Sequence, residues 1–273
     1  MKKSINPGGS RPLYSFTIAM LIFFAMSVTC QAQEEEPIYT TIAYMKVKQG
    51  DEGNYVDIEK TYWKPIHQEL VKQGKILGWY LYRIRYTGTG DEYQYATVTH
   101  IRGNENLEAG MYTGDLFSKV HPKVETSEIM AKTTASRDIV TRRLQVWQLS
   151  SFPEGDSEPS KYAVVNFQRS VPGTNYFALR RDYVKPAFDL AVKEGKMAGW
   201  GLWSLMFPQG GDIDYNWISV DLYNDFSKIN QFGWADLITR ANPKINLDEI
   251  GPQLGESRTM TRNELWVLVD YAR

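Results

Sequence analysis

One stretch of sequence occurs twice in this chain, and this duplication constrains the possible folds more than any other feature. The two copies lie about 121 residues apart, as Tyr62 and Tyr183 do. A repeated sequence is expected to build a repeated structural unit, so the fold must be derived for one unit and then doubled. The matched residues are Tyr62, Lys64, Pro65, Gly74, Lys75, Gly78 and Trp79 in the first copy, and Tyr183, Lys185, Pro186, Gly195, Lys196, Gly199 and Trp200 in the second.

The repeat predicts two units, residues 38–150 and 161–273, joined by a linker over 151–160. Pro153, Gly155 and Pro159 give the linker the composition of a connecting loop. Each unit predicts the same order of elements, in which apolar residues at intervals of three and four mark the first helix. The expected strands are 38–47, 78–86, 93–101 and 139–149, then 162–170, 199–207, 215–222 and 260–269; the first helices are 54–72 and 175–193, and second helical stretches end near Pro122 and Pro243.

This β-α-β-β-α-β order is that of a ferredoxin-like unit, with two helices on one face of a four-stranded antiparallel sheet. The period of two residues along a strand assigns Ala96 and Val98 to the helix side. It assigns Tyr93, Tyr95 and Thr97 to the opposite face. An aromatic sheet face requires a cover, and the second unit can provide one. We therefore expect an α+β fold of two tandem ferredoxin-like repeats, packed sheet to sheet as a pseudo-dimeric α+β barrel.

Residues 1–32 have the pattern of a secretory signal peptide. Lys2, Lys3 and Arg11 precede an apolar run over 16–28, and Ala32 provides a small residue at the cleavage site. A retained anchor is the alternative. Cys30, the single cysteine, could carry a lipid, although Ser27 and Thr29 depart from the usual lipidation pattern. The sequence therefore predicts a periplasmic or extracellular protein, with lipoprotein as the less favoured form.

Removal of this segment takes three basic residues from the 31, which leaves 28 against 32 acidic residues and a net charge of −4. A mildly acidic chain of mixed charge argues against nucleic acid as a partner. With no cysteine pair, the exported domain must be stabilised by its core alone.

The run from Tyr62 to His67, followed by Gly74 to Trp79, is similar to exported members of the dimeric α+β barrel superfamily. That superfamily includes antibiotic-biosynthesis-type monooxygenases and the NIPSNAP-like and EthD-like proteins. The resemblance covers nearly all of both halves and implies a pocket between helices and sheet. It does not imply one reaction, because the superfamily has no universal catalytic motif.

Three residues of the first helix are the candidate catalytic group. His67 is the candidate general base, because the second repeat has Phe188 there and histidine titrates near neutral pH. Tyr62 and Lys64 would lie at the mouth of the same pocket. The alternative for His67 is a helix position that tolerates either residue. The Lys64-Pro65 pair either opens a pocket by a kink or bends the helix round the barrel.

The candidate ligand-binding residues are aromatic or basic. Trp79 and Trp200 begin the strands that follow the helices, and each could line a ligand site or anchor the core. Arg83 and Arg85 share a strand face and could hold an anion or remain solvated. The full candidate set is Trp79, Arg83, Arg85, Tyr95, Tyr183, Lys185, Trp200 and Trp217.

The three histidines and single cysteine have no metal-ligand spacing, so no metal site is expected. We expect an exported protein that binds a small aromatic or apolar molecule, is non-catalytic or of unassigned activity, and uses no cofactor. The alternative is a cofactor-free monooxygenase or isomerase. Some barrels of this superfamily bind haem through a histidine, but no position here matches that ligand, so haem is a secondary option. Beyond the internal pseudo-dimer, a further homo-oligomer remains open.

Overall fold

The structure is a computed structural model that describes residue 1 and residues 36–273, except 89, 156–157, 230 and 232. The expected signal peptide therefore lies outside the described residues, apart from Met1. Residues Glu36–Arg273 form one compact unit. Within the described residues, every helix is too short or too polar to cross a membrane.

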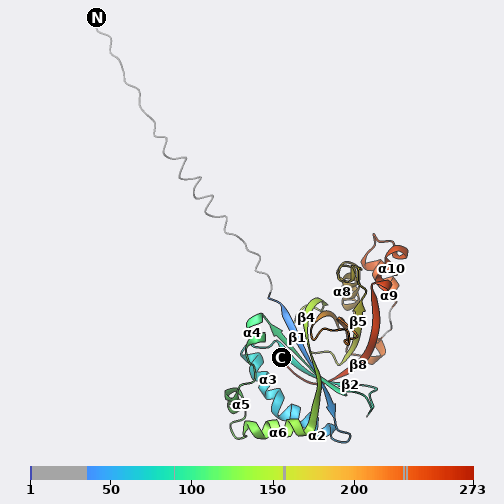
Figure 1. The fold of residues 1–273 in the computed structure, drawn as a ribbon. Coiled ribbons are helices and arrows are strands. Elements are labelled where there is room, and N and C mark those ends of the chain that lie inside the picture. Colours follow the sequence, from blue (N-terminus) through green and yellow to red (C-terminus); the bar gives the residue numbers. More distant parts are fainter. Residues whose placement is uncertain (2–35, 89, 156–157, 230, 232) are drawn as a thin grey trace. The chain divides into compact units, whose positions relative to one another are not determined.

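The first half has the expected order of strands, with more helix than the sequence predicts (Figure 1). Helix α6 follows Pro122 and was not expected. It packs against α2 and α5, so the helical layer of this half is larger than that of a minimal ferredoxin-like unit. The elements are β1 (Ile38–Val47), α2 (Glu52–Ile58), the π-helical turn η1 (Glu59–Trp63), α3 (Lys64–Lys72), β2 (Gly78–Ile84), β3 (Tyr95–Arg102), α4 (Asn104–Glu108), α5 (Gly114–Val120), α6 (Thr126–Ser136) and β4 (Arg137–Ser151).

The second half repeats this order. Helix α10 is the counterpart of α6 and was also not expected. The chain between β4 and β5 corresponds to the expected linker; the division into two domains remains a prediction, because both halves contribute to one sheet. The elements are β5 (Tyr162–Ser170), α7 (Tyr176–Leu179), the π-helical turn η2 (Arg180–Val184), α8 (Lys185–Lys193), β6 (Gly199–Phe207), β7 (Trp217–Tyr223), the 3-10 turn η3 (Phe226–Lys228), α9 (Trp234–Ala241), α10 (Leu247–Glu256) and β8 (Arg258–Ala272).

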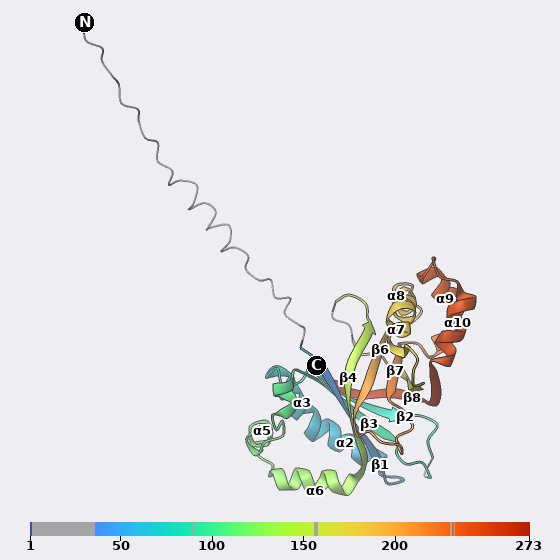
Figure 2. The same ribbon diagram turned by 45° about the horizontal axis from the view of Figure 1, so that its top comes forward.

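The eight strands form one closed antiparallel barrel in the order β1-β3-β2-β8-β5-β7-β6-β4. Each half contributes four neighbouring strands, and the halves meet at two edges, where β2 pairs with β8 and β4 pairs with β6. The two sheets are thus hydrogen-bonded edge to edge, rather than only stacked face to face as the sequence predicts. The helices of the two halves cover different sides of this barrel (Figure 2).

The strand faces are the reverse of the sequence expectation at most positions. Ala96 and Val98 point into the barrel, where they pack with residues of the second half such as Trp266. Tyr95 packs instead against Tyr55 under the helices, with ring centroids 4.9 Å apart. Tyr93 does face the barrel interior as expected, because it precedes the regular strand and does not follow its alternation.

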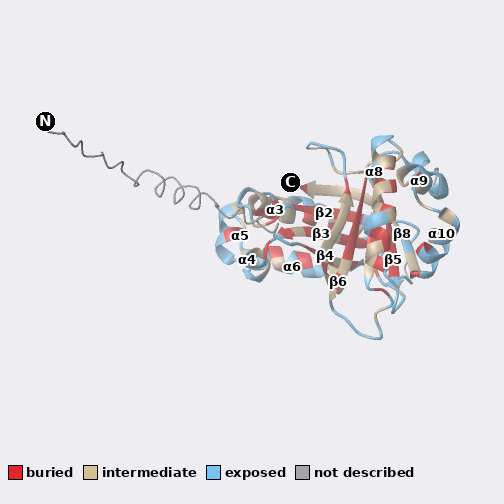
Figure 3. Cartoon of the chain, turned by 90° about the horizontal axis from the view of Figure 1, so that it is seen from above, coloured by how far each residue is buried: buried red, intermediate tan, exposed pale blue. Residues whose placement is uncertain are grey.

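The barrel interior and the two helix–sheet interfaces form three separate hydrophobic clusters. Figure 3 shows the same division: buried residues lie along the strands and the inner helix faces, and exposed residues lie on the outer helices. Any enclosed binding site must therefore lie inside the barrel or between the sheet and one of the helical layers.

Each Lys-Pro pair begins a new helical segment after a π-helical turn. Pro65 and Pro186 lie in the first turn of α3 and α8. In the preceding turns η1 and η2 the helix is wider, so the missing proline N–H is accommodated by the change in winding. Residues of both turns are buried against the sheet, among them Glu59 and Arg180. The predicted irregularity is real, and it positions the buried residues of the turn.

Candidate functional site

His67 is buried beneath the helices of the first half and fully engaged. Its ring stacks on Trp79 with centroids 4.6 Å apart and planes inclined by 7°. Its Nδ1 lies 2.7 Å from the Trp63 carbonyl oxygen, and its Nε2 lies 3.0 Å from the Tyr112 hydroxyl. Burial lowers the pKa of His67 to about 3. This side chain is neutral at physiological pH and has no ring nitrogen left for a substrate.

The structure does not bring the three candidate catalytic residues together. The Tyr62 hydroxyl accepts a hydrogen bond from Lys132 at 3.0 Å on the outer surface. The Lys64 ammonium forms an ion pair with Asp270 at 2.6 Å. Neither side chain is among the hydrogen-bond partners of His67.

The candidate ligand-binding residues are also dispersed. Arg83 and Arg85 are both exposed. Lys185 forms a surface ion pair with Asp189, and Tyr183 is half-buried. Of the aromatic candidates, Trp79, Tyr95 and Trp217 pack under the helical layers, and Trp200 lines a cavity.

That cavity lies in the second half, between the sheet and the helical layer, and has a volume of about 350 Å³. We call it the second-half cavity. Strands β5 and β7 form its floor, and η2, α8, α9 and α10 contribute its walls. Phe188, Trp200 and Trp234 provide aromatic surface, with Phe188 stacked on Trp200 at 4.4 Å. An aromatic pocket of this size suits a small ligand.

Val184 of η2 lines the second-half cavity. The repeat places Trp63 at the equivalent position of the first half, where the indole packs against Phe117 at 5.7 Å and donates to Thr133 at 2.9 Å. A bulky side chain thus occupies the space in the first half that remains open in the second.

The charges of the two halves differ at the same place. In the first half, the buried Glu59 carboxylate lies 3.3 Å from Arg137 and forms an ion pair. In the second half, the equivalent positions are Arg180 and Arg258, so two arginines meet without the carboxylate. Arg180 is only 4% exposed, and burial and the charge of Arg258 lower its pKa to about 10. Among the described residues, no ion pair joins either arginine to an acid.

Polar side chains form the floor of the second-half cavity. The Gln168 side-chain oxygen accepts hydrogen bonds from Tyr176 and Arg258, each at 2.7 Å. Asn166 donates to one oxygen of Asp221 at 3.1 Å. Met45 and Ala43 occupy the positions of Gln168 and Asn166 in the first half, so the polar floor is a property of the second half alone.

Three buried polar atoms on residues that line this cavity have no hydrogen-bond partner: Arg180 Nε, Asp221 Oδ1 and Trp200 Nε1. Buried polar atoms are normally paired, and leaving them unpaired is unfavourable by roughly 1–3 kcal/mol each. Three such atoms around one cavity indicate a site built for a polar ligand, with two donors and one acceptor available.

Asp221 has an acidity suited to proton transfer. Burial raises the pKa of its carboxyl group from 3.8 to about 7, while the Asn166 hydrogen bond and the Arg258 charge lower it by less. A buried carboxyl group that titrates near neutral pH is a candidate general base.

Sequence reasoning missed Arg180, Arg258 and Asp221 because it compared the two halves at His67 and Phe188 but not at these positions. The useful signal was divergence at matched positions. Glu59 becomes Arg180 and Trp63 becomes Val184 at the same spacing that matches Tyr62 with Tyr183.

No family model and no curated protein sequence matches this chain. Solved structures do match. A candidate monooxygenase from Fusobacterium nucleatum superimposes with a TM-score of 0.52 at 10% identity, over 88% of this chain and 95% of that one. A candidate monooxygenase from Lactobacillus acidophilus superimposes with a TM-score of 0.50 at 9% identity, over 87% of this chain and 96% of that one. A chlorite dismutase variant from Candidatus Nitrospira defluvii gives 0.47 at 14% identity, over 88% and 93%.

The two matches with TM-scores of 0.50 or more support the α+β fold with one large antiparallel sheet. At such low identities the likeness establishes the fold alone. The NIPSNAP-like assignment and the tandem pseudo-dimer remain predictions.

Two expectations about function are wrong. The two matches with TM-scores of 0.50 or more are named as candidate monooxygenases, against the main expectation of non-catalytic binding and on the side of the enzyme alternative. The matched structures also include a heme-binding protein from Thermus thermophilus, against the expectation that no cofactor is involved.

The residues that line the second-half cavity can be compared with the side chains that bind haem iron. Haem iron takes a His, Cys, Met or Tyr side chain as its axial ligand. The lining has no His or Cys; it has Tyr176 and Met260. The Tyr176 hydroxyl donates a hydrogen bond to Gln168, and burial raises the pKa of Tyr176. Met260 is exposed. These residues do not fit haem, and no step below passes through it.

Proposed function

We propose that this chain is an exported enzyme that binds a small aromatic carboxylate in the second-half cavity and transfers a proton at that substrate through Asp221. The observation that carries the proposal is the pair Arg180 and Arg258, the first buried and the second half-buried: neither has an ion-pair partner among the described residues, whereas Glu59 neutralises Arg137 in the first half. Buried charges in proteins are normally paired, so a carboxylate on the substrate would provide the missing charge.

The cavity provides groups for both ends of such a substrate. Arg180 Nε is an unpartnered donor, and a guanidinium binds a carboxylate with defined geometry. Phe188 and Trp200 offer stacked aromatic surface for a ring. The cavity would select a substrate that has a negative charge at one end, for Arg180, and a flat apolar ring at the other end, for Phe188 and Trp200.

Asp221 would act as the base. Asn166 holds its Oδ2 through a hydrogen bond, which leaves Oδ1 free to accept a proton from an acidic C–H bond of the substrate. The electrons of that bond remain on the substrate as a delocalised carbanion, and Asp221 becomes a neutral acid. The nearby Arg180 and Arg258 guanidinium groups favour the anion.

Two reactions can follow this step. Return of the proton to a different carbon completes an isomerisation. Alternatively, dioxygen takes the electrons of the carbanion, one oxygen atom enters the substrate and the other leaves as water with two substrate hydrogens, which is a monooxygenation. The names of the matched structures favour monooxygenation, the reaction class of the proteins from Fusobacterium nucleatum and Lactobacillus acidophilus.

We also propose that the two halves arose from one duplicated unit and form a pseudo-dimer with a single active site. The equal order of elements and the paired π-helical turns support this proposal. Glu59 and Trp63 would then close the first site by charge and by volume.

Proton transfer can be measured directly. With phenylpyruvate in D₂O, we expect the protein to accelerate deuterium exchange at the benzylic carbon. Proton NMR measures the rate of this exchange. The exchange rate should increase as pH rises, with its midpoint near pH 7, because Asp221 must be ionised to accept the proton. The charged and titratable groups that interact with Asp221 are Arg258 and Tyr223.

The variant Asp221→Asn should lower the exchange to background, a loss of roughly 100-fold or more. Asp57→Asn, an exposed position on α2, is the matched control and should leave the rate unchanged. Equal exchange rates in Asp221→Asn and the wild type would refute the role of Asp221.

A further inference from the structure

A second cavity lies inside the barrel, on the opposite side of the sheet from the second-half cavity. Its volume is about 440 Å³. We call it the barrel cavity. Inward-facing residues of both halves form its walls, and these include Tyr80, Tyr82, Trp147, Trp203 and Trp266. Eight-stranded barrels are wide enough to hold one small ligand.

The wall of the barrel cavity contains a buried donor without a partner. Gln145 is 1% exposed, and its side-chain nitrogen has no hydrogen-bond partner. A buried amide donor that remains unpaired is unfavourable unless a ligand atom accepts from it. This atom belongs to β4, a strand of the first half, and is independent of the arginine site.

His100 provides a second donor on the same wall. Its Nδ1 lies 2.8 Å from Thr40 Oγ1, and the Trp203 indole donates to that same oxygen at 2.9 Å. Since Thr40 Oγ1 accepts from Trp203, its own proton is available to His100 Nδ1. In the tautomer in which Thr40 donates to Nδ1, the ring proton resides on Nε2. Burial and the nearby Arg273 charge lower the pKa of His100 to about 4, so the ring is neutral at physiological pH.

The lining of the barrel cavity thus combines aromatic walls with two N–H donors and no carboxylate among its buried described residues. Its charged residues, Arg102, Glu158 and Arg273, are all exposed. This composition suits an uncharged aromatic molecule with an accepting oxygen, because a ligand that lacks the oxygen leaves the Gln145 donor unpaired.

We propose that the barrel cavity is a second ligand site, distinct from the proposed active site, for an uncharged aromatic carbonyl compound whose oxygen accepts hydrogen bonds from Gln145 and His100.

Two probes of the same shape test this proposal. 2-Acetonaphthone carries a carbonyl oxygen, and 2-ethylnaphthalene has a hydrocarbon group in its place. By equilibrium dialysis, we expect the ketone to bind the wild-type protein roughly tenfold more tightly than the hydrocarbon. In Gln145→Leu this preference should fall to within about threefold. His100→Phe should reduce it similarly, and it provides the same test if Gln145→Leu does not fold.

Arg180→Glu separates this site from the proposed active site, since it should leave ketone binding unchanged. Absence of ketone binding, or equal affinity for the two probes, would overturn the proposal. So would an unchanged preference in both Gln145→Leu and His100→Phe. A Soret band on addition of hemin that disappears in His100→Ala, without ketone binding, would assign the barrel cavity to an iron porphyrin instead.

Discussion

Glu59 and Arg180 occupy equivalent positions in the two π-helical turns and carry opposite charges. Glu59 neutralises Arg137, whereas Arg180 adds a second positive charge beside Arg258. The difference at this one position replaces an ion pair in the first half by two arginines without an ion-pair partner in the second, which is the basis of the proposed anion site. The surrounding backbone does not need to change for this to happen.

His67 and Phe188 also occupy matched positions with different chemistry. Both rings stack on a tryptophan, but only the His67 ring can bind a proton. Burial lowers the pKa of His67 from 6.5 to about 3. Between these values the unfolded chain binds a proton that the native protein does not, so the stability contributed by neutral His67 is lost as pH falls through this window.

His67→Phe removes this dependence. The stability of the wild type relative to His67→Phe should fall by about 2 kcal/mol between pH 7 and pH 5. Urea unfolding of both proteins at the two pH values measures the difference. Parallel changes in the two proteins would show that His67 is not held neutral by burial.

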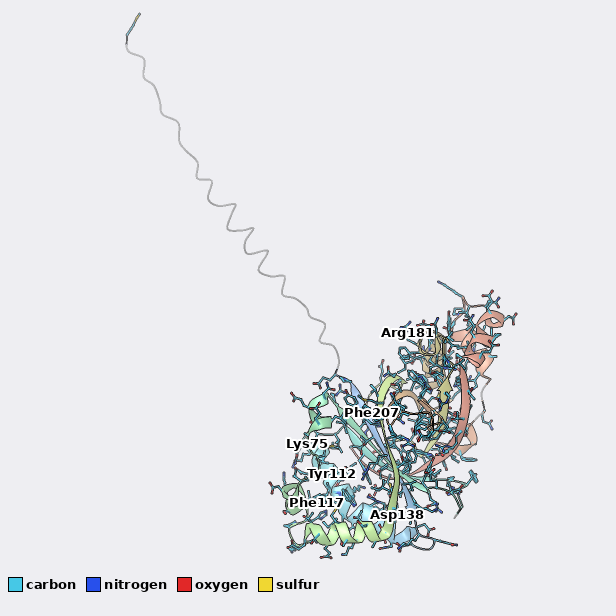
Figure 4. The ribbon with its side chains drawn as sticks, in the orientation of Figure 1. Lys75, Tyr112, Phe117, Asp138, Arg181 and Phe207 are labelled. Atoms are coloured by element: carbon cyan, nitrogen blue, oxygen red, sulfur yellow. The ribbon has the colours of Figure 1, made fainter. Side chains whose placement is uncertain are left out.

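Among the elements, the π-helical turns differ in the bulk of the residue at matched positions. This residue is Trp63 in the first half and Val184, which lines the second-half cavity, in the second. Tyr112 and Phe117, labelled in Figure 4, complete the filling of the first half through ring contacts with Trp63 at 5.5 and 5.7 Å.

Val184→Trp should fill the second-half cavity as Trp63 fills its counterpart. We expect affinity for 2-naphthoate to fall by more than roughly tenfold, since the ring has no space, with a change in stability of about 1–3 kcal/mol from overpacking. Isothermal titration calorimetry and thermal unfolding measure the two effects.

Val184→Ala is the matched control, and it should retain binding because it widens the cavity. If Val184→Trp binds 2-naphthoate as the wild type does, the ligand lies elsewhere.

Most element boundaries follow from local sequence signals. The strands Ile38–Val47 and Tyr162–Ser170 agree with the expected ranges, and Gly74 and Gly195, which both have positive φ, follow the ends of the first helices. Helices α6 and α10 were missed because the expectation ended each helical stretch at a proline. The strand faces were misassigned because both faces carry aromatic residues, so the period of two alone could not distinguish barrel interior from helix side.

The candidate site was less predictable than the fold. Arg180 and Asp221 lie 41 positions apart and become functional candidates only when burial and the absence of partners are known. Neither property can be read from local periodicity. His67 attracted attention because of its chemistry, but its stacked and fully hydrogen-bonded position gives it a packing role.

At the scale of the whole barrel, side chains from one half complete the core of the other. The Trp203 indole of the second half donates to Thr40 of the first. This indole lies against Gly201, where an added Cβ would contact the Trp203 ring. Glycine at this position therefore allows the two halves to meet.

Gly201→Ala should displace Trp203 and weaken the contact between the halves, with a loss of about 1–3 kcal/mol in the free energy of unfolding measured in urea. Gly53→Ala, on α2 with open space around it, is the control and should be neutral or slightly stabilising. Equal stability of Gly201→Ala and the wild type would mean that Trp203 does not depend on the glycine.

We propose that the second-half cavity binds an aromatic carboxylate because neither Arg180 nor Arg258 forms an ion pair with an acid among the described residues. Titration calorimetry of 2-naphthoate against the wild type, Arg180→Glu and Arg181→Glu tests it most directly. Arg181 is exposed at the outer surface and is the matched control (Figure 4). The account predicts binding to the wild type and to Arg181→Glu, and at least roughly tenfold weaker binding to Arg180→Glu, in which the new carboxylate pairs with Arg258. Failure of the wild type to bind, or equal affinity in all three proteins, would contradict it.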